Sequence, residues 1–234
     1  MNLPILECRN LSKSYGQSDL ALNNFSIALP RGKVIGLLGP NGSGKTTLIK
    51  LIAGLLTPTS GELLVNGMPI GVETKRIVSY LPERTYFDPG MQVEETIRYF
   101  ADFYMDFNAE KARAMLEDLG VDTNKKMKAL SKGTKEKVQL VLVMSRDAQL
   151  YLLDEPIGGV DPATRDYILN TIVSNYNPDS TVLISTHLIS DVEKVLDEFM
   201  FIHNGALVMY NSADNVREEL GKGIDELFRE VFRC

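Results

Sequence analysis

One short segment of this sequence matches a phosphate-binding pattern at every position. The segment is Gly39-Pro40-Asn41-Gly42-Ser43-Gly44-Lys45-Thr46, and the pattern is G-x-x-x-x-G-K-[ST]. An apolar run over residues 34–38 predicts a buried strand before it, and residues 47–53 have helical spacing after it. The glycines let several backbone N–H groups converge on one anion at the positive end of that helix. We expect Lys45 to reach the β- and γ-phosphates of a nucleotide, Thr46 to hold Mg²⁺, and Thr47 to belong to the same binding segment.

The composition describes an ordinary globular protein with enough residues to bury a core. The chain has 234 residues, of which 44% are hydrophobic and 24% charged, and its formal charge is −6. This acidic balance predicts no general attraction to nucleic acid or anionic lipid. The two cysteines, Cys8 and Cys234, form no disulfide or metal pattern and are interpreted as reduced thiols of a cytosolic protein. No signal peptide is expected at the N-terminus, and no apolar run of about 18 residues predicts a membrane span.

Strand-like and helix-like segments alternate along the chain, with one long helical stretch in the middle. Strands are expected over residues 3–15, 21–29, 34–38, 62–65, 77–81, 150–153, 181–185, 199–203 and 206–210. Helices are expected over residues 47–53, 93–104, 109–119, 132–144, 162–174, 188–196, 213–220 and 224–232, with Asn108 and Ser131 as caps. The pairs Asn66-Gly67 and Asn204-Gly205 predict tight hairpins. A single domain is expected, in which an α/β core (residues 1–84 and 149–234) is interrupted by a helical insertion (residues 85–148).

Two further strands are predicted to end in polar residues whose side chains can take part in catalysis or bind a metal. The run over residues 150–153 is followed by Asp154 and Glu155, and the run over residues 181–185 by His187. In a parallel sheet, groups at the carboxyl ends of strands face the ligand crevice. Asp154 would then meet the Mg²⁺, and Glu155 would orient or deprotonate the attacking water. Taken alone the carboxylates also fit a solvated acidic turn. His203, beside a hairpin, is interpreted as an ordinary residue.

These motifs, in this order, resemble the ATP-binding subunit of an ABC transporter, and the resemblance covers essentially the whole chain. The further matching positions are Tyr15 for the aromatic residue that stacks on adenine, Glu83 for a usual glutamine, Leu130-Ser131-Lys132-Gly133-Thr134 for the Leu-Ser-Gly-Gly-Gln signature, and Gly159-Val160-Asp161 for a loop that contacts the opposite monomer. Asp154, Glu155 and His187 match the magnesium, catalytic and switch residues. The substitutions resemble those of bacterial ABC-2-type exporter ATPases.

The resemblance implies a fold and an assembly. The fold is an α/β phosphate-loop NTPase with a RecA-like core, an N-terminal antiparallel β subdomain and an inserted α-helical subdomain. Two subunits of the family sandwich two ATP molecules head to tail, so Ser131 and Gly133 would bind the γ-phosphate held by the other subunit. The magnesium set would be Thr46, Glu83 and Asp154. Lys132 and Thr134 replace a glycine and a glutamine of the signature, and Glu83 adds a negative charge where the family has an amide.

The resemblance also implies partners, because a chain without a predicted membrane span cannot transport anything alone. We expect an integral membrane permease encoded separately, a closed dimer with a second copy or with a related ATPase subunit, and a position at the cytoplasmic face of the cell membrane. Export is the expected direction. The loop Tyr86–Met91 is expected to lie in a groove that grips a cytoplasmic helix of the permease. One alternative is a soluble ATPase of the same fold that acts on ribosomes, DNA or cofactor assembly; a small-molecule kinase is a third reading, which leaves His187 and Ser131 unused.

Overall fold

The structure, a computed structural model, describes residues 3–16 and 19–232, so Met1, Asn2 and Cys234 lie outside the described residues. The strands are β1 (Leu6–Ser14), β2 (Leu20–Leu29), β3 (Val34–Leu38), β4 (Ser60–Val65), β5 (Met68–Pro69), β6 (Val78–Leu81), β7 (Leu150–Asp154), β8 (Thr181–Thr186), β9 (Glu198–His203) and β10 (Ala206–Ser212). The helices are α1 (Lys45–Ile52), α2 (Val72–Ile77), α3 (Val93–Phe103), α4 (Ala109–Asp118), α5 (Lys132–Met144), α6 (Pro162–Asn175), α7 (Ile189–Val192), α8 (Ala213–Leu220) and α9 (Ile224–Phe232), with a 3₁₀ turn η1 (Met127–Ala129). Of the helices in this part of the chain, none is both long and apolar enough to cross a bilayer.

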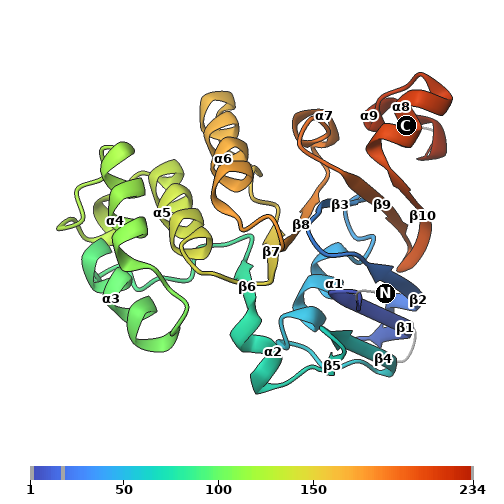
Figure 1. Cartoon of the computed structure of the whole chain (residues 1–234), viewed down its shortest axis with the longest axis horizontal. Coiled ribbons are helices and arrows are strands. Elements are labelled where there is room, and N and C mark those ends of the chain that lie inside the picture. Colours follow the sequence, from blue (N-terminus) through green and yellow to red (C-terminus); the bar gives the residue numbers. More distant parts are fainter. Residues whose placement is uncertain (1–2, 17–18, 233–234) are drawn as a thin grey trace.

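The larger sheet carries the predicted phosphate loop at one strand end (Figure 1). Its strand order is β10-β9-β3-β8-β7-β6, and β3, β6, β7, β8 and β9 run parallel. All residues of β3 and β7 are buried, because helices cover one face of the sheet and the second sheet with α1 covers the other. Continuous apolar strands of this kind are typical of parallel sheets. The carboxyl ends of β3, β7 and β8 therefore meet at one edge.

The smaller sheet is antiparallel and lies against α1. Its order is β2-β1-β4-β5, and its inward residues join those of α1 and one face of the larger sheet in a common core. The hairpin predicted at Asn66-Gly67 joins β4 to β5, and the hairpin predicted at Asn204-Gly205 joins β9 to β10. Asn66 and Asn204 both have positive φ, as such tight turns require. This sheet and the hairpins confirm the antiparallel part of the predicted fold.

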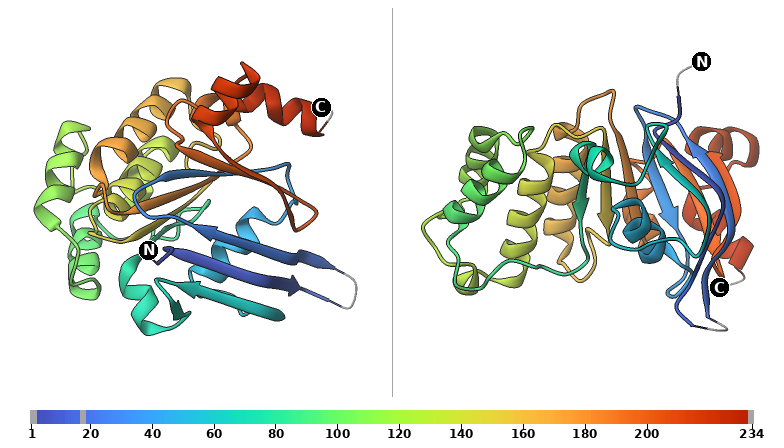
Figure 2. Two further views of the ribbon diagram at one scale, coloured as in Figure 1. Left: turned by 45° about the vertical axis from the view of Figure 1, so that its right-hand side comes forward. Right: turned by 90° about the horizontal axis from the view of Figure 1, so that it is seen from below.

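A separate helical group, α3 to α5, extends from one end of the molecule. In both views of Figure 2 these helices lie at the end away from β1, β2 and α9. They have an apolar core of their own, which includes Ile97, Leu116 and Val141. Helix α5 also contributes Leu140 and Val143 to the core beneath the larger sheet. The helical group is thus attached to the α/β core through α5.

The structure corrects two predictions about secondary structure. The helix expected over residues 188–196 ends at Val192, because Asp197 pairs with Val34: the Val34 N–H donates to the Asp197 carboxylate (2.7 Å) and the Asp197 N–H donates to the Val34 carbonyl (2.9 Å). The strand expected from residue 77 is preceded by the unpredicted α2, whose six residues are too few to show a helical period. The other predicted elements are present within one to three residues at each end.

Candidate functional site

The loop Gly39–Thr46 connects β3 to α1 and needs its glycines for packing as well as for binding. A Cβ atom on Gly39 would lie 2.3 Å from the carbonyl oxygen of Ile202, and one on Gly44, whose φ is +109°, would lie 2.4 Å from the carbonyl oxygen of Ala21. Gly44 is also the N-cap of α1, where no side chain caps the first turn. The N-termini of α4, α5, α6 and α8 are instead capped by Asn108, Ser131, Asp161 and Ser212. The first N–H groups of α1 are therefore left for an anion.

Lys45 lies inside the loop with its ammonium group at the loop carbonyls. Its Nζ donates to the carbonyl oxygens of Gly39 (2.8 Å) and Pro40 (3.1 Å), and its side chain is 6% exposed. Burial lowers the pKa of Lys45, and the carboxylates of Glu155 and Asp154 oppose this effect. The loop thus holds a cation at the point where the sequence predicts phosphates.

Asp154, at the carboxyl end of β7, is almost fully buried and only partly satisfied. Its Oδ1 accepts hydrogen bonds from the Ser185 hydroxyl (2.6 Å) and the Thr46 hydroxyl (3.2 Å), while its Oδ2 is buried and has no partner among the described residues. Burial raises the pKa of Asp154, and the two hydroxyl groups oppose the rise. A buried, half-satisfied carboxylate beside the loop is the arrangement expected where a cation is to be held.

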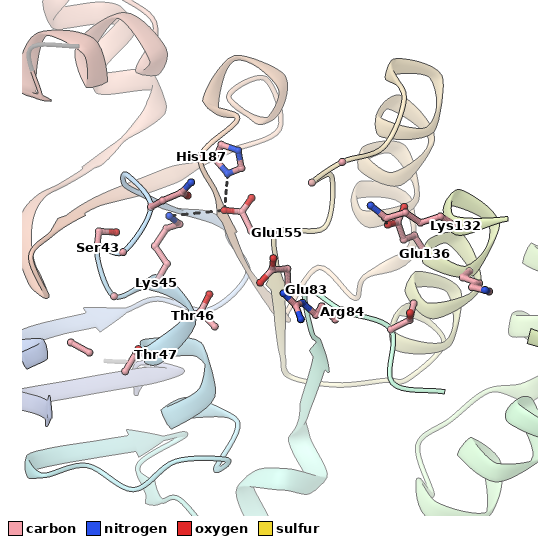
Figure 3. Close-up of a pocket in the computed structure, with 18 residues that line it drawn as sticks. Ser43, Lys45, Thr46, Thr47, Glu83, Arg84, Lys132, Glu136, Glu155 and His187 are labelled. Atoms are coloured by element: carbon pink, nitrogen blue, oxygen red, sulfur yellow. Dashed lines mark hydrogen bonds and ion pairs between the residues drawn. The ribbon is translucent and has the colours of Figure 1, made fainter. Parts of the chain in front are cut away.

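Glu155 and His187 lie together at the mouth of the loop. The Glu155 Oε1 is 3.0 Å from His187 Nδ1 and 4.0 Å from Lys45 Nζ (Figure 3). The Glu155 Oε2 is buried, and no residue in the described part of the chain bonds to it. Glu155 has a φ of +50°, a left-handed conformation that costs a non-glycine residue about 1–2 kcal/mol. Such strain at a residue between a strand and a turn is typical of functional sites. The three side chains, predicted from separate motifs, are brought together by the sheet.

These residues border an open depression of about 870 Å³, which we call the polar hollow. One wall is the phosphate loop with Thr46 and Thr47, and the floor includes Glu155 and His187. Figure 3 shows Lys132 and Glu136, from the first turns of α5, on the opposite wall. Lys132 Nζ is 3.7 Å from Glu136 Oε1, and burial raises the pKa of Glu136 while Lys132 opposes the rise. The hollow is large enough for a nucleotide and rich in groups that bind phosphate.

Four other predicted site residues lie outside the group formed by Lys45, Glu155 and His187. Tyr15 lies beside α1 with its hydroxyl 3.3 Å from Thr47 Oγ1, and Lys13 Nζ lies 5.6 Å from the centre of its ring. Glu83 is exposed and borders the polar hollow. The Ser131 hydroxyl accepts from the Thr134 N–H (3.2 Å) and so caps α5. Neither Ser131 nor Gly133 lines the hollow of its own chain, whereas Lys132 between them does.

The oxygen atoms near Thr46 suit a small divalent cation. The donors are the Thr46 hydroxyl, the unpartnered Oδ2 of Asp154 and the carboxylate of Glu83, which borders the same space. Among the described residues no cluster of three or more His, Cys, Asp or Glu side chains is placed to hold a metal by itself. Magnesium commonly keeps its waters and uses one or two carboxylates together with substrate phosphates. The donor set therefore fits Mg²⁺ that arrives with a nucleotide.

The structure adds site residues that sequence reasoning did not single out. Ser185 was noted only as the end of a strand, yet its hydroxyl contacts Asp154. Arg84, Lys135 and Glu136 line the polar hollow. The signal for Arg84 was its place next to Glu83, and the signal for Lys135 and Glu136 was their place in the first turns after Ser131. Nothing local in the sequence distinguishes Ser185 from other serines in strands.

A second depression, of about 530 Å³, lies between the α/β core and the helical group. Four aromatic side chains line it, and we call it the aromatic groove: Tyr80, Tyr86, Phe100 and Tyr104. Burial raises the pKa of Tyr80 to about 12 and also raises that of Tyr86, so both phenols are neutral. The predicted loop at Tyr86–Met91 thus contributes Tyr86 to the groove, and the remaining walls come from distant parts of the chain.

Arg146 joins the two sides of the aromatic groove. Its guanidinium group makes two hydrogen bonds to the Asp106 carboxylate (3.1 and 3.0 Å) and donates to the carbonyls of Val78 (2.7 Å) and Arg76 (2.7 Å). It also lies 3.9 Å from the centre of the Tyr104 ring. Because Asp106 follows α3 and Val78 begins β6, this side chain adds a polar connection between the helical group and the sheet to the apolar packing of α5.

Comparison with known proteins gives a consistent set of matches. A family model described as "ABC transporter" matches residues 22–158. The SkfA peptide export ATP-binding protein SkfE of Bacillus subtilis (strain 168) is 31% identical over 212 residues, which cover 88% of this chain and 88% of that protein. The lantibiotic transport ATP-binding protein SrtF of Streptococcus pyogenes is 28% identical over 219 residues, covering 92% and 95% of the two chains.

A solved structure described as the ATP binding subunit of an ABC transporter matches with a TM-score of 0.86 and 30% sequence identity. The match covers 97% of this chain and 99% of that chain. The whole described architecture, with both sheets and the helical group, is therefore similar to that of a solved ATP-binding subunit.

Proposed function

This chain belongs to the ABC transporter family as an ATP-hydrolysing subunit, and we propose that it powers export through a separately encoded membrane permease. The resemblance drawn from the motifs is thereby confirmed at the level of the family and the fold. The observation that carries the proposal is the meeting of Lys45, Glu155 and His187 at the mouth of a complete phosphate loop. Export is supported by the names of the matched relatives, one of which is named a peptide export ATP-binding protein.

The residues at and beside the phosphate loop have separate roles in the proposed ATP hydrolysis. The loop N–H groups and Lys45 bind the β- and γ-phosphates and offset their charge. Glu155 has one oxygen on His187 and a second that no described residue contacts, and it accepts the proton of the attacking water. His187 holds Glu155 in place and contacts the γ-phosphate in this proposal. Magnesium would add further neutralisation of the phosphate charge, held by Thr46, Asp154 and Glu83.

The remaining predicted residues act at the edge of the site or from a second subunit. Tyr15 stacks its exposed ring on the adenine. Ser131 and the backbone of Gly133 bind the γ-phosphate of the opposite subunit when ATP closes a head-to-tail dimer, and hydrolysis opens it. Because this chain contains both Glu155 and His187, a homodimer would have two complete sites; a heterodimer with a related subunit is the other form of the assembly.

The aromatic groove is the proposed docking site for the permease. Its rings give an apolar floor, and four cations line it: Lys50, Lys75, Arg84 and Arg146. Among the described residues no acidic side chain lines the groove, and of the four cations Arg146 alone is paired with a carboxylate, that of Asp106. The groove therefore suits a short amphipathic helix whose apolar face carries a carboxylate at its rim.

The proposed division of the chain follows from these two sites. Residues 1–84 and 149–234 form the nucleotide-binding core with its antiparallel sheet, and residues 85–148 form the helical signature subdomain of one ATP-binding domain. Docking to a permease would hold the domain at the cytoplasmic face of the cell membrane. No nucleic acid takes part in this proposal. The soluble alternative, an ATPase acting on ribosomes or on cofactor assembly, leaves the aromatic groove without an occupant.

Capture from native membranes tests the proposal. The tagged chain is purified from gently solubilised membranes, and the proteins that come with it are identified by mass spectrometry. We expect a stoichiometric protein with several membrane spans, and we expect the double variant Lys50→Glu, Lys75→Glu to lose it. Lys194→Glu, an exposed lysine outside both depressions, is the matched control. Recovery from the cytosol alone, with ribosomal or assembly proteins, would favour the soluble alternative.

A further inference from the structure

One buried serine contacts both carboxylate residues at the end of β7, Asp154 and Glu155. Ser185 is the fifth residue of β8, is 0% exposed, and lies opposite Asp154 in the parallel ladder of β7 and β8. Its hydroxyl donates to Asp154 Oδ1 (2.6 Å) and accepts from the Glu155 N–H (3.2 Å). The Glu155 N–H also donates to the Ser185 carbonyl (3.0 Å). Ser185 is thus bonded to two residues to which the proposed function gives separate tasks.

The hydrogen bond from the Ser185 hydroxyl gives the two oxygens of the Asp154 carboxylate different surroundings. Oδ1 is engaged by the hydroxyls of Ser185 and Thr46, and Oδ2 has no partner among the described residues. Because Asp154 is 1% exposed, water does not compete freely for these positions. The Ser185 hydroxyl therefore fixes the rotation of the carboxylate and keeps Oδ2 free for a cation.

The second contact secures an unfavourable backbone conformation. Glu155 has a φ of +50°, and its N–H is shared between the carbonyl and the hydroxyl of Ser185. A non-glycine residue keeps such a conformation only where its surroundings hold it. The Glu155 side chain in turn contacts His187, two residues after Ser185. One short strand end thus positions both the carboxylate and its histidine.

We propose that Ser185 is the positioning residue of the ATP site, holding the Asp154 carboxylate for magnesium and the Glu155 backbone for catalysis. This inference rests on the proposed ATPase function. A serine needed only for packing would be replaceable by alanine, because the two side chains differ by one oxygen atom. A positioning serine would not be, because the metal-dependent part of nucleotide binding would fall with the loss of its hydroxyl.

The test compares nucleotide affinity with and without magnesium. Isothermal titration with the non-hydrolysed analogue AMP-PNP is carried out in Mg²⁺ and again in EDTA, on the full chain. In Ser185→Ala we expect affinity in Mg²⁺ to fall about tenfold, as for a lost hydrogen bond to a charged group, and affinity in EDTA to stay within about twofold of the unaltered chain. We call the ratio of the AMP-PNP affinity in Mg²⁺ to that in EDTA the magnesium increment. Ser185→Thr retains the hydroxyl and should keep this increment.

Ser79→Ala is the matched control. Ser79 is 1% exposed in the same sheet, and its hydroxyl donates to the Val143 carbonyl (3.0 Å), away from the carboxylates. It should keep the magnesium increment. The inference would be overturned if Ser185→Ala kept the full magnesium increment, or if Ser79→Ala or Ser185→Thr lost as much of it as Ser185→Ala. It would also be overturned if the unaltered chain bound AMP-PNP equally well with and without magnesium.

Two further outcomes have separate meanings. If Ser185→Ala does not yield folded protein by circular dichroism, Ser185→Cys takes its place, since a thiol has nearly the same shape and is a weaker donor. A partial loss of the magnesium increment in Ser185→Cys then supports the inference, and an unchanged increment contradicts it. If the unaltered chain binds no AMP-PNP either in Mg²⁺ or in EDTA, the proposed ATPase function itself fails.

Discussion

The two depressions of this molecule differ in how their residues are distributed along the chain. The polar hollow is built mainly from the ends of neighbouring parallel strands and from the turns after them, so each of its chemical groups belongs to a short local motif. The aromatic groove takes Lys50 from α1, Tyr86 from a loop, Tyr104 from the end of α3 and Arg146 from beyond α5. We propose the first as the site for a small, highly charged ligand, and the second as the docking surface for an amphipathic helix. Variants that affect one depression and spare the other test this division.

The largest effect is expected from Glu155→Gln. The amide cannot accept the proton of the attacking water, and a lost general base typically lowers turnover by a factor of 10² to 10⁴, so we expect a decrease of roughly a thousandfold. ATP binding should persist, and closed dimers should accumulate with ATP in sedimentation experiments. Capture of the permease should be unchanged. Normal ATP turnover would show that Glu155 is not the base.

Lys45→Ala should weaken nucleotide binding about a hundredfold. The ammonium group of Lys45 lies at the loop carbonyls, and its loss removes a charge-assisted contact to each of two phosphates, about 2.7 kcal/mol in all. Calorimetric titration with AMP-PNP measures the change. The variant should still bring the permease down from membranes without nucleotide. If it fails to do so while folded, the two depressions are not separable.

Arg146→Met should act at the groove and lower stability. It leaves Asp106, which is 25% exposed, without its partner and frees the carbonyls of Val78 and Arg76. Since partial exposure reduces the cost of a broken buried pair, we expect a loss of about 2 kcal/mol, seen as a Tm lower by roughly 5 °C. AMP-PNP affinity should stay within about twofold.

Arg98→Met is the control for this substitution, because Arg98 is 71% exposed and its pair with Glu94 lies on the surface. Its effect should be within about 0.5 kcal/mol of zero. Equal losses in the two variants would mean that Arg146 does not join the helical group to the sheet.

The smallest effect is expected from Tyr15→Ala at the rim of the polar hollow. Loss of one stacking contact should weaken AMP-PNP binding about fivefold, or roughly 1 kcal/mol. Tyr15→Phe retains the ring and should bind normally. If the phenylalanine variant loses as much as the alanine variant, the hydroxyl contact to Thr47 matters and stacking does not.

The same division explains what the sequence reveals in advance. The strand before the phosphate loop, the caps at Asn108 and Ser131 and the closing helices α8 and α9 follow from local patterns, and the structure contains them. The approach of Lys45, Glu155 and His187 follows from strand order, because parallel neighbours end at one edge. These are properties of short segments and of a common topology.

What the sequence does not reveal depends on contacts between distant residues. The left-handed conformation of Glu155 is held by Ser185, 30 residues later in the chain. The early end of α7 is set by the pairing of Asp197 with Val34. One wall of the groove includes Arg146, which connects Asp106 to β6 across 40 and 68 residues of sequence. No periodicity or motif encodes such long-range contacts.

Helix α5 borders both depressions, and this gives the molecule a mechanical property. Lys132 and Glu136 in its first turns line the polar hollow, whereas Val143 in its last turn, and Arg146 just beyond, line the aromatic groove. Its 13 residues span about 20 Å as one stiff rod. The second half of α5 packs between two apolar cores, whereas its first turns border the open hollow. We therefore expect a movement of the first turns of α5 towards a phosphate to shift its last turn at the aromatic groove as well.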